Sequence, residues 1–187
     1  MENEVLECAT EEVLKRIAGR DKNALRELHQ MHGNKLYTEL ARLLSDRELA
    51  RITYLELMPR VWREAATYDP SVEDGLDWLL RRTRCLAIER LKEKAGDQPF
   101  YGRNIAWEED ADLDQTERQL RHHQVGRINT ALRTLSVQAA EMLVARLVYG
   151  LSLDDLGSLY NLPSQVVGRR VRSAGVALRT QLLGAAC

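Results

Sequence analysis

The stretch LSLDDLGSLYNLPSQVVGRRVRSAGVAL, residues 151–178, decides the fold of the C-terminal part of the chain. Ser152 is a typical helix N-cap residue, and Asp155 follows three positions later, as at the start of a helix. Asn161 to Pro163 has the composition of a tight turn, and a second helix follows from Ser164. The second helix repeats apolar residues at helical spacing, namely Val166, Val167, Val171 and Ala174. The pattern predicts a helix-turn-helix.

Arginines stand between these apolar positions. At 100° per residue, Arg169 and Arg172 share one side of the second helix. That side has the shape and charge to enter the major groove of DNA. A solvated basic face on an ordinary helical hairpin has the same periodicity and remains an alternative at this point.

The composition of the whole chain favours an all-α fold. Its 187 residues allow one domain or two small ones, and with only four prolines and one Phe it has almost no strand-like runs. A net charge of −1 argues against a polybasic polymer binder. The predicted helices are 10–19, 22–44, 46–67, 74–94, 116–133, Ser136–Tyr149, Ser152–Tyr160 and Ser164–Leu183.

Helix breakers divide the chain into two helical domains. Residues 1–95 and 119–187 are predicted to be domains, and the polar, acidic segment 96–118 is predicted to be a linker. Within the first domain, Ser45 with Glu48 resembles a capping box. Pro59 is expected to kink the third helix or to restart it near Met58.

The remaining sequence features argue against disulfide bonds, a metal site and catalytic activity. The three cysteines, Cys8, Cys85 and Cys187, form neither a disulfide pattern nor a zinc motif, and the paired histidines lack partners at metal-ligand spacing. No catalytic motif is present, so we expect no enzyme, no metal and no cofactor. Without a membrane-length apolar run or a basic signal-peptide start, the protein is expected to be cytoplasmic.

Taken together, the sequence resembles the extracytoplasmic-function (ECF), or group four, sigma factors of bacterial RNA polymerase. The resemblance runs from Gly19 to about Leu182. In the second half it rests on Leu135, the run Gly150 to Asp155, Leu156, Leu162-Pro163, Val167, Arg170 and Ala174. In the first half it rests on Asp21, Ala24, Leu28, Ala50, Val61-Trp62-Arg63, Tyr68-Asp69, Trp78-Leu79, Ala87-Ile88 and Arg90.

The resemblance implies a four-helix sigma-two domain that binds core polymerase and the melted promoter, and a sigma-four domain that reads promoter DNA. The matching recognition-helix residues are Gln165, Val166, Arg169, Arg170 and Arg172. Candidate phosphate partners for the melted strand are Arg81, Arg82 and Arg84, whereas Trp78 is expected in the core. Cys85 replaces an Asn that is frequent in the family, which puts the base pocket in doubt.

The polymerase-binding motif departs from the family. It falls at about Ala50 to Leu55, and the candidate contacts are Arg51, Ile52, Leu55 and Glu56. Where most members carry acidic residues, this chain has Arg51 and Ile52. The family's clamp surface is basic, so this replacement is expected to weaken unaided polymerase binding.

Thr53 offers a remedy for the missing charge. Phosphorylation adds about −1.5 to −2 charges and three acceptor oxygens. A branch of the family that lacks the acidic motif is activated in this way by a Ser/Thr protein kinase, and this sequence resembles that branch. Thr53 is therefore the predicted phosphoacceptor. The alternative is that Thr53 is an ordinary helix-surface threonine and the protein a divergent sigma factor.

Three functional hypotheses follow. The first is a sigma factor that directs polymerase to promoter DNA and is activated at Thr53. The second is a sigma-like adaptor for an anti-sigma or signalling protein that never initiates transcription, and the third is a stand-alone helix-turn-helix DNA binder. An anti-sigma factor is a further possible partner of the first.

Overall fold

The computed structural model describes residues 2–101 and 114–184, and within them every regular element is a helix. The all-α prediction is confirmed. The chain divides into two compact units, Met1–Arg90 and Leu91–Cys187. Of the predicted linker 96–118, residues 102–113 lie outside the described residues, including the acidic residues 108–112. No described helix is both long and apolar enough to cross a membrane.

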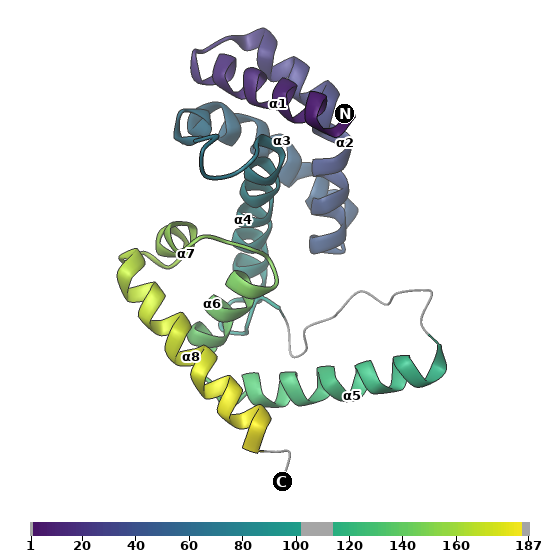
Figure 1. Ribbon diagram of the computed structural model, residues 1–187, viewed down its shortest axis with the longest axis vertical. Helices are drawn as coiled ribbons and strands as arrows, with labels where there is room; N and C mark the ends of the chain where they lie inside the picture. The colour runs from purple at the N-terminus through teal and green to yellow at the C-terminus, as the bar shows by residue number, and fades with distance from the viewer. Residues whose placement is uncertain (1, 102–113, 185–187) are drawn as a thin grey trace. The chain divides into compact units, whose positions relative to one another are not determined.

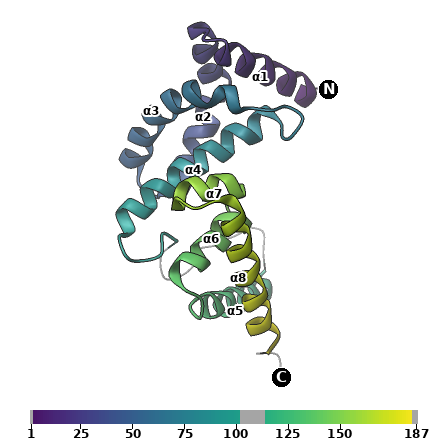
Figure 2. The same cartoon turned by 90° about the vertical axis from the view of Figure 1, so that its left-hand side faces the viewer.

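The first unit is built from four α-helices and one short 3-10 helix (Figures 1 and 2). Their bounds are α1 Glu2–Ala18, α2 Lys22–Leu44, α3 Arg47–Glu64, η1 Ala65–Thr67 and α4 Gly75–Ala95. Helix α2 packs against α1 and α3. The core of the unit includes Leu14, Leu28, Leu57 and Trp78, all nearly inaccessible to solvent. The prediction that Trp78 is a core residue is confirmed.

The prediction that Ser45 opens a capping box is wrong. Ser45 is not the N-cap of α3 but the left-handed C-cap of α2, with φ 51°. The N-cap is Asp46, whose carboxylate accepts hydrogen bonds from the backbone N–H groups of Glu48 and Leu49, both at 3.1 Å. Helix α3 continues through Pro59 to Glu64, so of the two outcomes predicted at Pro59, a kink or a restart, the restart is wrong. Both Pro59 and Leu55 lie on the exposed side, where water can bond the carbonyl that Pro59 leaves without a donor.

The second unit contains α5 Gln115–Leu132, α6 Val137–Leu147, α7 Leu153–Tyr160 and α8 Ser164–Gly184. Helix α8 packs against α5, α6 and α7 (Figures 1 and 2). The core of the second unit contains Met142, Leu143, Leu156 and Val167. The predicted order of four helices in this region is confirmed, because the apolar repeats and the glycine and proline breaks fall where the helices begin and end.

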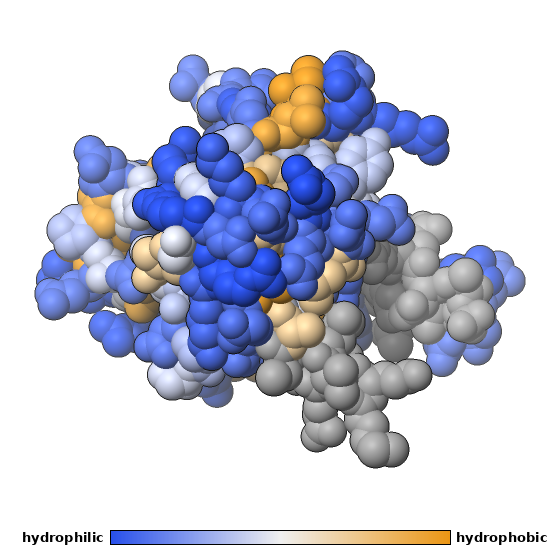
Figure 3. Space-filling model, turned by 90° about the horizontal axis from the view of Figure 1, so that it is seen from above, coloured by the Kyte–Doolittle hydropathy of each residue, from blue (hydrophilic) through white to orange (hydrophobic). Residues whose placement is uncertain are grey.

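Hydrophilic side chains cover most of the face drawn in Figure 3, and apolar residues form only small patches on it. Such a mixture is ordinary for a folded domain. The candidate functional surfaces are therefore identified from individual residues and their partners.

Candidate nucleic-acid interface

The helix-turn-helix is formed by α7 and α8. A reciprocal capping box starts α7: the Ser152 hydroxyl accepts from the Asp155 backbone N–H at 3.1 Å, and the Asp155 carboxylate accepts from the Ser152 backbone N–H at 2.9 Å. Asn161 ends the helix in the left-handed conformation. A Cβ at Gly157 would lie 2.7 Å from the Leu162 carbonyl oxygen, so the turn requires glycine there. The predicted motif is confirmed.

Helix α8 presents a basic side to solvent. Val167, Gly168 and Ala174 are buried, whereas Gln165, Arg169 and Arg172 are exposed and Val166 is half-buried. An open hollow of about 560 Å³ is lined by Leu153, Asp154, Ser164, Gln165, Gly168, Arg169 and Arg172. Within residues 2–101 and 114–184, neither Arg169 nor Arg172 forms an ion pair, so both guanidinium groups are available to a ligand.

Arg170 lies on a different side of α8. It is exposed, and its guanidinium donates a hydrogen bond to the Gln138 side chain of α6. The structure therefore brings Gln165, Arg169 and Arg172 around one hollow and separates Arg170 from them.

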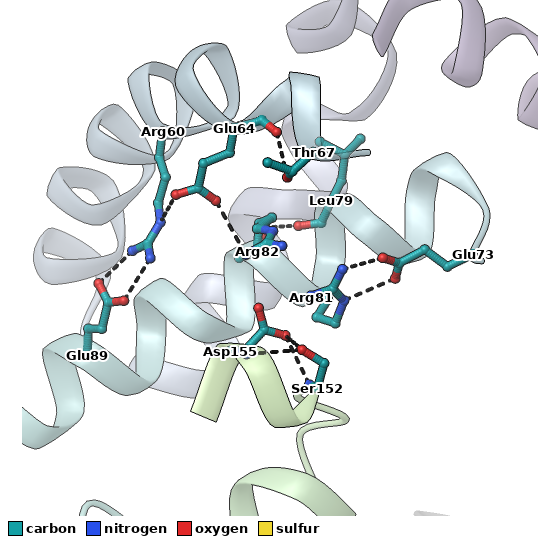
Figure 4. A network of polar contacts seen from close by, with 11 residues as sticks. Arg60, Glu64, Thr67, Glu73, Leu79, Arg81, Arg82, Glu89, Ser152 and Asp155 are labelled. Carbon is teal, nitrogen blue, oxygen red and sulfur yellow. Dashed lines mark hydrogen bonds and ion pairs between the residues drawn. The ribbon is translucent and has the colours of Figure 1, made fainter. Parts of the chain in front are cut away.

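The three arginines of α4 that were predicted to bind the melted strand all have carboxylate partners within the first unit, and Figure 4 shows those of Arg81 and Arg82. Arg81 pairs with Glu73, and Arg82 lies 3.4 Å from Glu64 and over the Trp78 ring. Arg84 donates to Glu39 of α2 at 2.6 Å. These pairs tie α4 to neighbouring segments, so a phosphate would have to compete with a carboxylate at each arginine.

The exposed side of α3 carries apolar side chains among charged ones, and two of its carboxylates are paired with arginines. Ile52 is 43% and Leu55 is 60% exposed. Arg51 lies 2.7 Å from Glu48, and Glu56 forms an ion pair with Arg90. Of the residues predicted to contact polymerase, Arg51, Ile52 and Leu55 are exposed and Glu56 is half-buried. The carboxylates of Glu48 and Glu56 are paired with arginines of the same unit.

Thr53 lies on the buried side of α3, whereas a phosphoacceptor beside the polymerase-binding surface would have to be exposed. It is fully buried, at 0% exposure, and its hydroxyl donates to the Leu49 backbone carbonyl at 2.7 Å. The hydroxyl is inaccessible to a kinase in this conformation, because phosphoryl transfer needs the oxygen in a protein active site. The expectation that Thr53 adjoins the docking surface is corrected here: Ile52 and Leu55 face outward, and Thr53 faces the core.

Sequence reasoning missed Glu141, a carboxylate in the middle of apolar α6. It is only 4% exposed and accepts three hydrogen bonds, from Lys92 Nζ at 2.9 Å, the Phe100 backbone N–H at 2.9 Å and the Tyr160 hydroxyl at 2.7 Å. Burial, followed by the bond to Glu141, raises the pKa of Tyr160 above its usual value. The signal in the sequence is a lone acid in the run VQAAEMLVARL, but its partners are distant in sequence.

The histidines take structural positions. Buried His32 lies 2.7 Å from the Thr10 hydroxyl through Nε2, and exposed His29 lies 2.6 Å from the Tyr54 hydroxyl through Nδ1. Among the described residues, no group of three or more His, Cys, Asp or Glu side chains could hold a metal ion.

No family model matches the sequence. Among curated proteins, the chain is similar to ECF RNA polymerase sigma factors. Over 87 residues it is 32% identical to ECF RNA polymerase sigma factor SigK of Mycobacterium tuberculosis (strain ATCC 25177 / H37Ra) and of Mycobacterium bovis (strain BCG / Pasteur 1173P2), covering 46% of this chain and 46% of each relative.

The same protein from Mycolicibacterium vanbaalenii is 32% identical over 82 residues, or 44% of this chain and 42% of the relative. The similarity thus spans less than half the length of these curated relatives. Among solved structures, CnrH in complex with the cytosolic domain of CnrY has a TM-score of 0.40 and 18% identity, with 95% of this chain and 98% of that chain covered.

Proposed function

We propose that this protein is an ECF-type sigma factor that binds core RNA polymerase and directs it to promoter DNA. The observation that carries the proposal is the exposed Arg169 and Arg172 side of α8, held on a helix-turn-helix at the C-terminal end of an all-helical chain. The partial similarity to sigma factors supports it. Such a protein acts in the cytoplasm, where promoter DNA and polymerase are found.

We further propose that polymerase contacts the exposed side of α3. Because Glu48 and Glu56 are already paired with arginines, this surface offers little free negative charge to a basic partner. Ile52 and Leu55 instead offer apolar area, which is buried favourably at about 25 cal/mol per Å². Unaided binding is therefore expected to be weaker than binding through an acidic surface.

Reconstitution with purified core polymerase tests the proposal. The chain is mixed with core enzyme and genomic DNA fragments, and both co-elution and run-off transcripts are measured. A sigma factor gives transcripts that core enzyme alone does not give, and Leu55→Asp lowers co-elution while an exposed control, Val72→Asp, does not. DNA binding without co-elution would identify a stand-alone regulator, and co-elution without transcripts would identify an adaptor.

Regulation by a Ser/Thr protein kinase at Thr53 is the finer part of the proposal. The pairing of Glu48 and Glu56 with arginines favours such regulation, since a phosphate would restore the negative charge that these pairs neutralise. Because Thr53 is buried, α3 has to open locally before the Thr53 hydroxyl can be phosphorylated. Mass spectrometry of the protein from growing cells tests it: phosphate on Thr53 supports the switch, and unmodified Thr53 in transcriptionally active protein contradicts it. An anti-sigma factor is an alternative regulator.

A further inference from the structure

We propose that α8 divides its polar residues by role: Gln165 selects adenine and Arg169 selects guanine about two base pairs away, whereas Arg170 binds the phosphate backbone. This inference rests on the proposed binding of promoter DNA. It assigns base preference to individual residues, which neither the helix-turn-helix fold nor its overall charge determines.

The first argument is the spacing along α8. Gln165 and Arg169 are four residues apart, 40° from one another around the helix and about 6 Å apart along it. Base pairs are stacked at about 3.4 Å, so the two side chains reach positions about two base pairs apart when α8 follows the groove. In helix-turn-helix proteins the first residues of the second helix contact base edges, and both residues lie in its first two turns.

The second argument is the chemistry of the hollow that they share. Gln presents a donor and an acceptor that match adenine, and Arg presents two donors that match O6 and N7 of guanine. Asp154 lines the same hollow, and its carboxylate repels phosphate oxygens while accepting bonds from base amino groups.

Arg170 has a different environment. It lies 100° around the helix from Arg169, and its hydrogen bond to Gln138 holds it beside the start of α6. The hollow there is about 390 Å³ and is lined by Leu135, Ser136, Gln138, Ala139, Arg170, Ser173, Ala174 and Ala177. None of these is acidic, so no carboxylate opposes a phosphate beside Arg170, whereas Asp154 stands beside Arg169 and Arg172 in the first hollow.

Selection of binding sites from a pool of randomised duplexes tests the assignment. The full-length protein is used alone and with core polymerase, as wild type, Arg169→Gln and Arg170→Gln, with helix content checked by circular dichroism. Arg169→Gln is expected to change the preferred base at one position from guanine to adenine and to lower affinity for the guanine duplex about 5- to 100-fold. Its salt dependence should stay unchanged.

Arg170→Gln is the matched control. It is expected to weaken binding to all sequences equally and to reduce the slope of log K against log salt by about 0.9. The assignment is overturned if Arg169→Gln weakens binding to all sequences equally with a smaller salt slope, or if it keeps the guanine preference. It is also overturned if the wild-type protein enriches no sequence either alone or with core polymerase. Initiation without these preferences would overturn the assignment alone, whereas selective binding without initiation would overturn the sigma-factor function alone.

Discussion

Replacing Thr53 with Glu is expected to destabilise the first unit and not to imitate phosphorylation. The side chain at this position is fully buried, and its hydroxyl bonds a backbone carbonyl of its own helix. Glu adds volume to a packed site, which costs about 1–3 kcal/mol, and an unpaired buried charge costs about 3–5 kcal/mol. Since domains are stable by only about 5–15 kcal/mol, a loss of about 4 kcal/mol or more leaves little reserve.

Urea unfolding followed by tryptophan fluorescence measures this loss, because Trp62 and Trp78 both belong to the first unit. The matched control is Ile52→Glu, which adds the same charge one residue away on the exposed side and should change stability by less than about 1 kcal/mol. Thr53→Val keeps the shape and should cost about 1 kcal/mol for its hydrogen bond. Equal midpoints for the Glu variants at positions 53 and 52 would refute the buried placement of Thr53.

Three further predictions concern buried groups. Glu141→Ala leaves its donors without an acceptor and should lower the stability of the second unit by about 2–4 kcal/mol, with faster hydrogen exchange at the Phe100 amide; unchanged protection there would contradict the hydrogen bond. Burial lowers the pKa of His32 below its usual 6.5, so as pH falls the unfolded state takes up a proton before the folded state does, and stability is lost below about pH 6.5. The urea midpoint should therefore be lower at pH 5.5 than at pH 7.5, and this decrease should be smaller in His32→Gln. Gly157→Ala places a Cβ 2.7 Å from the Leu162 carbonyl and should lower the melting temperature and DNA affinity together, so full affinity in this variant would argue against the tight turn.

Most of the helices could be predicted because their signals are local. Apolar spacing, the Ser152 capping box and the Asn161 to Pro163 turn each depend on residues within a few positions of one another. The first helix begins earlier than the predicted residue 10, at Glu2. Val5, Leu6 and Ala9 continue the helical spacing of Val13 and Leu14 toward the start of the chain, a signal that the prediction did not use.

The candidate site was less predictable, because it depends on partners distant in sequence. Arg84 resembles a free phosphate ligand until α2 brings Glu39 beside it. Thr53 has exposed neighbours at positions 51 and 52, but it lies at helical spacing from Ala50 and Leu57 and shares their buried side. That spacing was a local signal of its burial that the prediction did not use. The α8 residues were easier to identify, since the exposure of Arg169 follows from helical spacing alone.

Mapping the 5′ ends of transcripts made by core polymerase with this protein tests the central claim most directly. The account predicts new 5′ ends that share a sequence element at a fixed distance upstream, and it predicts that these ends are lost when Arg169 and Arg172 are both changed to Ala. The same 5′ ends with and without the protein would contradict it.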